Sequence, residues 1–310
     1  MANKNSNNCV VLRLSEKTRE KLIKYYEDKK KDKEIPYVVF QAKDGDTVIT
    51  LYTSGKVMFQ GVSADIDANM WTDIDGVEKI DKVKIKKEEK KYYECSSVGS
   101  DEVGTGDYFG PIVVTSCYVS KDDIAFVESL GIKDSKKLDD DKIIKIVPEL
   151  IKKIKYKSLI MSNSEYNTKY GNSYNMNKIK AIMHNKVLYK MTHEEQIEYD
   201  YIIVDEFARE ARYYEYLDNN PEIQRNITFM TKAEDKNLAV ACASVISRYI
   251  FLKEFDKICD SIHIPLVKGA GSEVDKIGKE VVEKYGKEKL KEIAKYNFKN
   301  TERILGIMIF

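Results

Sequence analysis

The sequence is poor in the residues that build zinc sites and disulfide frameworks. Its five cysteines are odd in number, scattered, and nowhere spaced as a Cys-x-x-Cys pair. This pattern indicates a reducing compartment and argues against both a disulfide framework and a zinc centre. Two of them, Cys117 and Cys242, lie inside apolar runs and are predicted to be small core residues. The histidines show no ligand spacing, and each is predicted to be a surface or capping residue: His184, His193 and His263.

Long apolar runs and a strong excess of either charge are also lacking. No run could span a bilayer, and residues 1–8 are polar, without the core of a signal peptide. We therefore expect a cytoplasmic protein with no membrane partner. The formal net charge is only +1 although 33% of the 310 residues are charged, so any strong charge must be segregated locally. This length allows about two domains, each with its own core.

Residues 1–80 are predicted to form a small α+β unit. Ser15 is the predicted N-cap of a helix over residues 15–31. Alternating strands are predicted at 37–43, 47–53 and 56–61, followed by a helix at 64–74 that holds the only tryptophan. Residues 81–94 are dense in Lys and Glu and are predicted to be a charged linker. This linker is either a solvated spacer or a basic tether near a polyanion.

Residues 95–310 alternate predicted strands and helices, which indicates an α/β fold. The segments include a mixed region at 157–162, a helix at 177–192 and an apolar strand at 201–204. A long helix is predicted at 238–259. Its early run of Ala, Cys and Ser would permit close packing on a sheet.

The most informative stretch is 100–115, Ser-Asp-Glu-Val-Gly-Thr-Gly-Asp-Tyr-Phe-Gly-Pro-Ile-Val-Val-Thr. Asp101 and Glu102 end a short apolar run, and a glycine-rich turn follows at once. A dinucleotide-binding loop has similar glycines, but that fingerprint needs a following helix to bind the pyrophosphate. Here Pro111 leads into a β-branched run with strand composition. The stretch therefore predicts a metal site on a β-hairpin, with a purely structural strand–turn–strand as the alternative.

Two further acids stand where catalytic groups are commonly presented. Asp205 ends the apolar strand at 201–204, and Glu234 precedes the helix at 238–259, where negative charge is favoured. Each alone is better explained as an ordinary strand-end or helix-start residue. Four carboxylates in one domain, however, would repel one another without a cation, and Mg²⁺ prefers such oxygen ligands. Two such ions about 3.5–4 Å apart can activate water and stabilise the leaving oxygen of a phosphodiester.

Lysines accompany these acids in polar or glycine-rich segments. They are Lys136, Lys137, Lys232 and Lys268. Each alone is an ordinary solvated lysine. Around a metal site, they would together form a rim that contacts phosphates.

Several motifs recur in one order along residues 95–310. They are 101–111 (Asp-Glu-Val-Gly-Thr-Gly-Asp-Tyr-Phe-Gly-Pro), 134–138 (Asp-Ser-Lys-Lys-Leu), 174–177 (Tyr-Asn-Met-Asn) with His184-Asn185 downstream, Asp205, 232–234 (Lys-Ala-Glu) before the Ala/Ser-rich helix, and 268–271 (Lys-Gly-Ala-Gly). Together they resemble the motifs of the type 2 ribonuclease H family, in the form carried by ribonuclease HIII. The resemblance covers most of this region, and the first motif is highly specific.

The resemblance implies a ribonuclease H-like mixed sheet flanked by helices. It also implies an endonuclease that hydrolyses the RNA strand of RNA–DNA hybrids and leaves 3′-hydroxyl and 5′-phosphate ends. The catalytic and metal-binding acids would be Asp101, Glu102, Asp205 and Glu234, with Mg²⁺ as cofactor and Mn²⁺ as a substitute. Asp101 would hold both ions, Glu102 and Glu234 the ion that activates water, and Asp205 the ion at the leaving group. Asp235 is the alternative fourth acid, although Lys232-Ala233-Glu234 aligns better.

The same resemblance implies the substrate contacts. Gly104, Thr105 and Gly106 occupy the place of the Gly-Arg-Gly loop of ribonuclease HII, where the backbone approaches the ribose and the 2′-hydroxyl distinguishes RNA from DNA. Thr105 replaces the arginine, which leaves open whether a single ribonucleotide in DNA is cut. The resemblance also implies that residues 1–80 form a substrate-binding domain similar to the TATA-box-binding protein fold. The strands predicted within 37–61, with a helix on either side, are similar to half of that saddle, whose sheet would hold the substrate. The expected contact positions there are Tyr52, Thr53, Ser54, Lys56 and Phe59.

Three alternatives to hybrid cleavage remain. The nearest is ribonuclease HII-like cleavage at single ribonucleotides in DNA. The others are a non-catalytic nucleic-acid-binding protein and a different metal nuclease, such as a junction resolvase. We expect an RNA–DNA hybrid as partner, a monomer, and no small-molecule cofactor.

Overall fold

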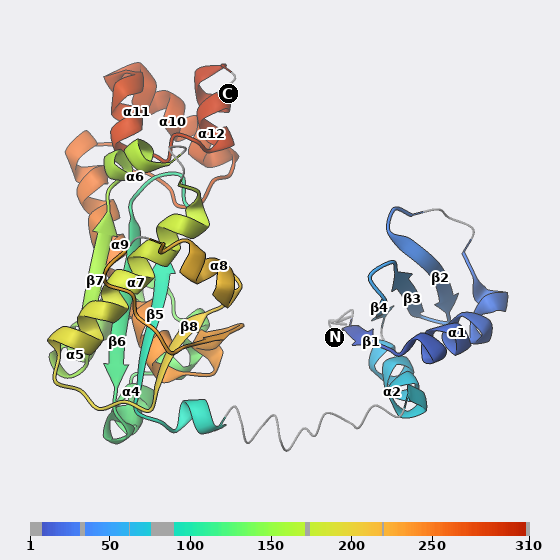
Figure 1. Cartoon of the computed structure of the whole chain (residues 1–310). Coiled ribbons are helices and arrows are strands. Elements are labelled where there is room, and N and C mark those ends of the chain that lie inside the picture. The colour runs from blue at the N-terminus through green and yellow to red at the C-terminus, as the bar shows by residue number, and fades with distance from the viewer. Residues whose placement is uncertain are drawn as a thin grey trace, which may run out of the picture. The chain divides into compact units, whose positions relative to one another are not determined.

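The computed structural model describes residues 8–31, 35–61, 63–75, 90–170, 174–218 and 220–307. The chain forms two compact units, residues 1–88 and 89–310, each built on its own sheet (Figure 1). Most of the predicted charged linker, 81–94, lies outside the described residues, and 90–93 form a single helical turn. Among the described residues, no helix is long and apolar enough to cross a membrane.

The N-terminal unit is a four-stranded antiparallel sheet in the order β1-β4-β3-β2, with two helices packed on one face. Its elements are β1 (Asn8–Arg13), α1 (Glu16–Tyr25), the 3₁₀ turn η1 (Glu27–Lys29), β2 (Val38–Asp44), β3 (Thr47–Tyr52), β4 (Lys56–Gly61) and α2 (Ala64–Asp75). Ser15 caps α1 as predicted, because its hydroxyl accepts the Thr18 amide at 3.3 Å. The helix ends at Tyr25, however, and not at Lys31. The edge strand β1 was not predicted.

The second unit is a five-stranded mixed sheet in the order β7-β6-β5-β8-β9. Its strands are β5 (Ser97–Val103), β6 (Ile112–Val119), β7 (Lys155–Met161), β8 (Tyr201–Asp205) and β9 (Ile227–Met230). The antiparallel β5–β6 hairpin confirms the two strands predicted around the glycine-rich turn. Since a strand and not a helix follows that turn, the dinucleotide-binding alternative is wrong.

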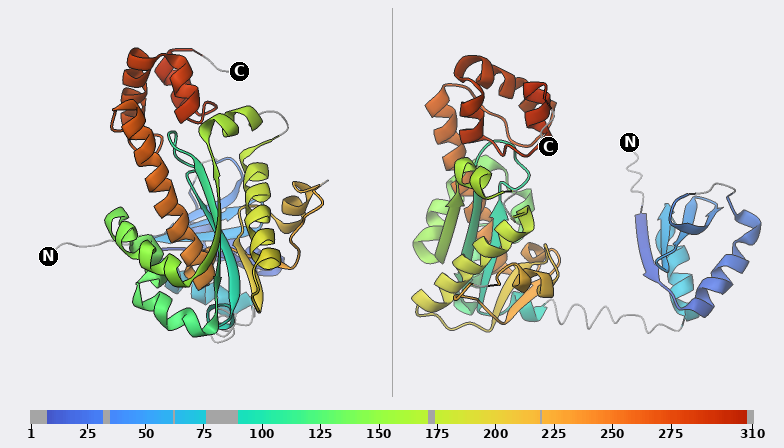
Figure 2. Two further views of the ribbon diagram at one scale, coloured as in Figure 1. Left: turned by 90° about the vertical axis from the view of Figure 1, so that its left-hand side faces the viewer. Right: turned by 45° about the horizontal axis from the view of Figure 1, so that its top comes forward.

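Helices cover both faces of this sheet and one of its ends. They are α4 (Ile124–Ser129), α5 (Asp140–Lys153), α6 (Asn163–Lys169), α7 (Met176–Glu194), α8 (Glu210–Glu215), α9 (Leu238–Ile262), α10 (Ser272–Tyr285), α11 (Lys287–Ile293) and α12 (Lys299–Leu305), with 3₁₀ turns η2 (Lys121–Asp123), η3 (Ile132–Lys137) and η4 (Ala233–Asp235). Figure 2 shows α9 on one face and α7 on the opposite face. The helices α10 to α12 gather beyond one end of the sheet (Figure 1).

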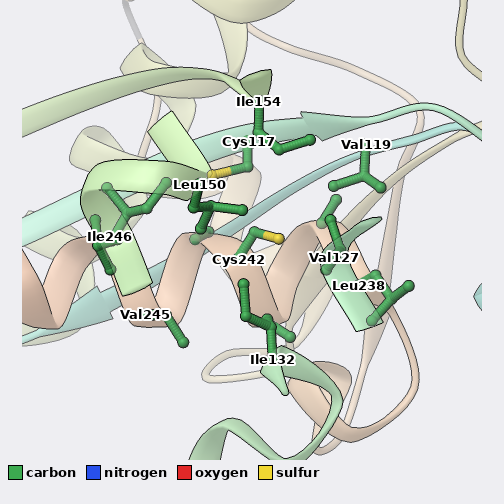
Figure 3. Close-up of a cluster of buried hydrophobic side chains, with 14 of the residues drawn as sticks. Cys117, Val119, Val127, Ile132, Leu150, Ile154, Leu238, Cys242, Val245 and Ile246 are labelled. Atoms are coloured by element: carbon green, nitrogen blue, oxygen red, sulfur yellow. The ribbon is translucent and has the colours of Figure 1, made fainter. Parts of the chain in front are cut away.

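The core between α9 and the sheet explains how closely they pack. Cys117 of β6 and Cys242 of α9 are fully buried in it, as predicted for small core residues (Figure 3). A Cβ added to Gly99 of β5 would lie 2.4 Å from the Val240 amide nitrogen. Only glycine therefore permits this approach, and the small residues that begin α9 pack on the sheet as expected.

The register of the sheet sets the position of the acids. β5 runs parallel to β8, with Ser100 opposite Val204, and β8 runs parallel to β9, with Asp205 opposite Met230. The carboxyl ends of the three strands therefore meet at one edge of the sheet. Asp101 and Asp205 lie at this edge on neighbouring strands, and η4 follows β9 directly. Ligands of α/β sheets bind preferentially outside such strand ends.

Candidate active site

Three of the four predicted acids line a single cavity at this edge. The cavity has a volume of about 340 Å³ and is lined by Asp101, Ser135, Lys136, Ile143, Asp205, Glu234, Ser244, Val245 and Arg248. The acids come from β5, β8 and η4, while α9 and η3 supply the other polar side chains. Glu102 does not line the cavity. The register of the sheet thus brings together residues that are more than 130 positions apart in the sequence.

The environment of Asp101 disfavours its charge. Burial, and then the negative charge of Glu102, raise the pKa of Asp101 to about 8, although hydrogen bonds with Ser244 and the Glu102 amide act to lower it. The amide–carboxylate bond is 2.9 Å long. A cation in the cavity would favour the ionised carboxylate, because an opposite charge lowers the pKa of an acid.

Glu102 faces α7 and is already paired. Its carboxylate accepts hydrogen bonds from Lys180 Nζ at 2.5 Å and from His184 Nε2 at 2.8 Å. Burial alone would raise the pKa of Glu102, but the hydrogen bond and charge of His184, together with Lys180, lower it to about 2. Glu102 is therefore ionised at neutral pH, and its charge is balanced within the fold.

The prediction that every histidine is a surface or capping residue is wrong for His184. This side chain is 1% exposed, and its Nδ1 is hydrogen-bonded to Ser100 Oγ at 2.8 Å. His263 does cap the end of α9, and His193 is exposed. Lys180 was not singled out at all. Its spacing of four residues from His184 puts both on one helix face, which is the signal that would have found it.

Asp205 and the segment before α9 are tied together. The Ala233 amide donates to Asp205 Oδ1 at 3.0 Å, which holds Glu234 beside the end of β8. Lys136 Nζ lies 2.5 Å from Glu234 and 2.9 Å from Asp235. Glu234 lines the cavity and its side chain is 17% exposed, whereas that of Asp235 is 48% exposed. The geometry favours Glu234 over Asp235 as the fourth acid.

The predicted lysines differ in their positions. Lys136 lines the cavity, whereas Lys268 pairs with Asp140 at the start of α5. Lys232 is exposed in a left-handed conformation, and the side chain of Lys137 lies outside the described part of the structure. Sequence reasoning missed Arg248 of α9, which lines the cavity and pairs with Asp140 at 2.6 Å.

The glycine-rich loop contains one glycine that the fold requires and one that it does not. Gly104 has φ of +95°, and an added Cβ would lie 2.1 Å from the Pro111 carbonyl oxygen. Gly106, by contrast, has no neighbour within 4 Å of an added Cβ. The open surroundings of Gly106 leave its backbone accessible, which fits the close approach expected of a ligand.

The described carboxylates are not arranged as a preformed metal-binding site. Within the described ranges, no group of three or more His, Cys, Asp and Glu side chains is placed so that it could hold an ion. Glu102 and Glu234 instead have lysine partners. The oxygen donors that line the cavity are nevertheless of the kind that Mg²⁺ and Mn²⁺ prefer.

The predicted contact residues of the N-terminal unit lie on two different faces of its sheet. Tyr52 and Lys56 belong to the uncovered face, where Val11 and Val39 are 53% and 57% exposed. Phe59 is fully buried beneath α1 and α2, so its predicted contact with substrate is wrong. The alternation of side chains along β4 separates Phe59 from Lys56.

Comparison with known proteins shows the family to which this chain belongs. The family model described as Ribonuclease HII matches residues 98–301, and a domain of unknown function, DUF3378, matches residues 9–84. Ribonuclease HIII of Bacillus cereus is 38% identical over 97% of this chain and 99% of its own length. Ribonuclease HIII of Lysinibacillus sphaericus is 39% identical over 95% of this chain and 97% of its own length.

A solved structure gives the same result. Bst-RNase HIII in complex with Mn²⁺ has a TM-score of 0.71 and 35% identity, covering 96% of this chain and 98% of its own. The match includes both units and therefore supports the predicted combination of a ribonuclease H-like sheet with a small N-terminal domain. The chain belongs to the ribonuclease HIII family, a family of endonucleases.

Proposed function

We propose that the protein hydrolyses the RNA strand of RNA–DNA hybrids and leaves 3′-hydroxyl and 5′-phosphate ends. The observation that carries the proposal is the convergence of Asp101, Asp205 and Glu234 on one cavity at the end of β5, the strand that leads into the glycine-rich loop. Three converging carboxylates would repel a phosphodiester by themselves. A site of this kind is useful for cleavage only with bound cations.

The donor set fits a divalent metal ion. Asp101, Asp205 and Glu234 supply oxygen ligands. Burial, and then the negative charge of Glu102, raise the pKa of Asp101, and a bound cation would lower it again. Ions bound there, Mg²⁺ or Mn²⁺, would supply the Lewis acid that activates water and stabilises the leaving oxygen. Glu102, which does not line the cavity, is proposed as the remaining member of the four acids and is kept ionised by Lys180 and His184. Lys136 neutralises Glu234 and is placed to turn toward a phosphate instead.

The remaining assignments concern substrate. The backbone of Gly104, Thr105 and Gly106 is proposed to contact the ribose, since Gly106 is open and the 2′-hydroxyl can be read there. Phosphate contacts are proposed for Lys136, Lys137, Lys232 and Lys268, with Tyr52 and Lys56 contributing from the N-terminal unit. The proposal takes residues 1–80 as the substrate-binding domain, 81–94 as linker and 95–310 as the catalytic domain. It also takes the enzyme to act as a cytoplasmic monomer without a small-molecule cofactor.

Cleavage mapping on defined duplexes tests the proposal. The wild type should cut a long RNA–DNA hybrid in Mg²⁺ or Mn²⁺ and should be inactive with excess chelator. Asp101→Asn should lower kcat at least about 10³-fold, because an oxygen ligand with its charge is lost, while hybrid binding largely persists. The exposed Asp122→Asn is the matched control and should retain full activity.

Other outcomes would favour the alternatives. Efficient cutting of a duplex with one embedded ribonucleotide would favour ribonuclease HII-like activity, the question that Thr105 in place of arginine leaves open. Hybrid binding without turnover in either metal, unaffected by Asp101→Asn, would indicate a non-catalytic binding protein. Cleavage of DNA four-way junctions would indicate a resolvase.

A further inference from the structure

Lys295 is a fully buried lysine whose position is not explained by the proposed contacts with metal ions or phosphates. It lies between α11 and α12, and its side chain is 0% exposed. Its side-chain nitrogen Nζ donates to the carbonyl oxygens of Asp107 at 2.8 Å and Gly110 at 2.7 Å. No ion pair of Lys295 occurs among the described residues. Burial lowers the pKa of Lys295 to about 7. A buried polar group needs hydrogen-bond partners, and here both bonds go to one short loop.

The loop that Lys295 holds is the second half of the glycine-rich turn. Backbone bonds fix the same segment to the C-terminal part of the chain: Lys295 N to Tyr108 O at 2.8 Å, Gly110 N to Ile293 O at 3.1 Å, and Tyr108 N to Gly269 O at 2.8 Å. The Asp107 carboxylate accepts the Gly269 amide at 2.6 Å, and the Tyr108 hydroxyl is hydrogen-bonded to Thr301 at 2.9 Å. Residues 107–110 are therefore held in place by hydrogen bonds to the segments around α10, α11 and α12.

The first half of the turn is not held in this way. Gly104 is fixed in a left-handed conformation against Pro111, but Gly106 has no neighbour within 4 Å of an added Cβ. The path of Thr105 and Gly106 is consequently set by its two ends. One end is the β5 strand, and the other is the segment that Lys295 secures.

We propose that Lys295 is a positioning residue that sets the backbone path of the glycine-rich loop and, through it, the discrimination between ribose and deoxyribose. The inference rests on the proposed contact of residues 104–106 with the RNA strand. Lys295 acts through the carbonyl groups of Asp107 and Gly110 and does not itself touch the substrate. Small displacements of positioned groups can cost large factors in rate, so the effect should be measurable.

A selectivity ratio tests this role independently of how much enzyme is folded. The two substrates are a DNA-flanked tract of four ribonucleotides paired with DNA, and the same tract with one ribonucleotide beside the scissile phosphate replaced by its deoxy analogue. The ratio of their kcat/KM values reports how strongly the 2′-hydroxyl is read, and partial unfolding leaves this ratio unchanged. Lys295→Met removes both side-chain hydrogen bonds to the loop and keeps an unbranched side chain of similar length. Lys299→Met, at an exposed position in the same segment, is the control.

Lys295→Met should reduce the ratio about tenfold, which corresponds to the loss of about one hydrogen bond, and Lys299→Met should leave it unchanged. A wild-type ratio in folded Lys295→Met enzyme would overturn the inference and leave the proposed function intact. Failure of the wild type to cut the ribonucleotide tract would overturn both.

A second variant decides the matter if Lys295→Met does not fold. Asp107→Ala removes the acceptor of the Gly269 amide and so weakens the attachment of residues 107–110. Asp107 is partly exposed, so this change leaves no cavity at the buried Lys295. It should reduce the ratio in the same direction, and Asp107→Asn, which keeps an acceptor oxygen, should restore it. An unchanged ratio in Asp107→Ala would count against the proposal.

Discussion

Asp101 and Glu102 are adjacent on β5 but contact opposite helices: Asp101 is hydrogen-bonded to Ser244 of α9, and Glu102 to Lys180 and His184 of α7. Successive side chains of a strand point to opposite faces of a sheet, which explains the separation. The two carboxylates therefore have different electrostatic environments. Asp101 lines the cavity and has a raised pKa, and Glu102 belongs to a partly buried ion-pair network and has a lowered pKa.

The pairing of Glu102 predicts a pH-dependent effect of Lys180→Met. Removing one partner of this pair should lower the free energy of unfolding by about 3 kcal/mol at pH 7, measured with urea in metal-free buffer. Because folding lowers the pKa of Glu102 from 4.5 to about 2, the stabilisation is complete above pH 4.5. It is lost as the pH falls toward 2, so the difference between wild type and variant should shrink below pH 4.5.

Lys186→Met is the control for this measurement. Lys186 is exposed on the same helix, and its replacement should change the free energy of unfolding by less than about 0.5 kcal/mol at every pH. A difference for Lys180→Met that stays constant down to pH 3 would show that Lys180 contributes through packing and not through the charge of Glu102.

The neighbouring acids Glu234 and Asp235 form a matched pair of variants. Both contact Lys136, but only Glu234 lines the cavity. Glu234→Gln should lower kcat on RNA–DNA hybrids about 100-fold and raise the Mg²⁺ concentration needed for half-maximal rate. The kcat of Asp235→Asn should stay within about twofold of the wild-type value, since an exposed acid outside the cavity contributes little to the reaction. The opposite order of the two effects would make Asp235 the fourth acid.

The glycine-rich loop predicts a contrast between folding and activity. Gly104→Ala should lower the free energy of unfolding by more than about 2 kcal/mol, because φ is positive there and the new Cβ would overlap the Pro111 carbonyl oxygen. The methyl group of Gly106→Ala would have open space around it, so the free energy of unfolding of this variant should lie within about 0.5 kcal/mol of the wild-type value.

Cleavage by the two variants should not follow their stabilities. Gly106→Ala should lower kcat/KM on hybrids about tenfold, since its added methyl group lies where the ribose is proposed to approach. Suppose that Gly106→Ala has the melting temperature of the wild type and full activity. The backbone at Gly106 then does not contact the substrate.

Local signals in the sequence were sufficient for much of the site. Asp101, Asp205 and Glu234 could be predicted because each stands at the end of an apolar strand or just before a long helix. Parallel strands bring such ends to one edge, so their convergence follows from the fold class. The glycine-rich turn could be assigned to a hairpin because a β-branched run follows it.

Contacts between distant segments could not be predicted. His184 pairs with a residue 82 positions away, and Lys295 with residues 188 and 185 positions away. No periodicity in the sequence encodes such pairs. β1 was missed for a related reason: it is a short edge strand whose pairing depends on β4, some fifty residues downstream. Tyr26, which follows the early end of α1 at Tyr25, is likewise buried beside Trp71, 45 positions away.

The uncovered face of the N-terminal sheet predicts a binding defect without a chemical defect. Lys56→Glu reverses a charge on this face, opposite Arg13 on β1. It should weaken hybrid binding severalfold at low salt and reduce the slope of log K against log [salt] by about 1, because one phosphate contact is lost. At saturating substrate, kcat should stay within about twofold of wild type, since the acids belong to the other unit. Lys24→Glu, which makes the same charge change on the exposed side of α1, should bind normally. Equal weakening by both variants would show that the N-terminal unit acts through its net charge and not through this face of the sheet.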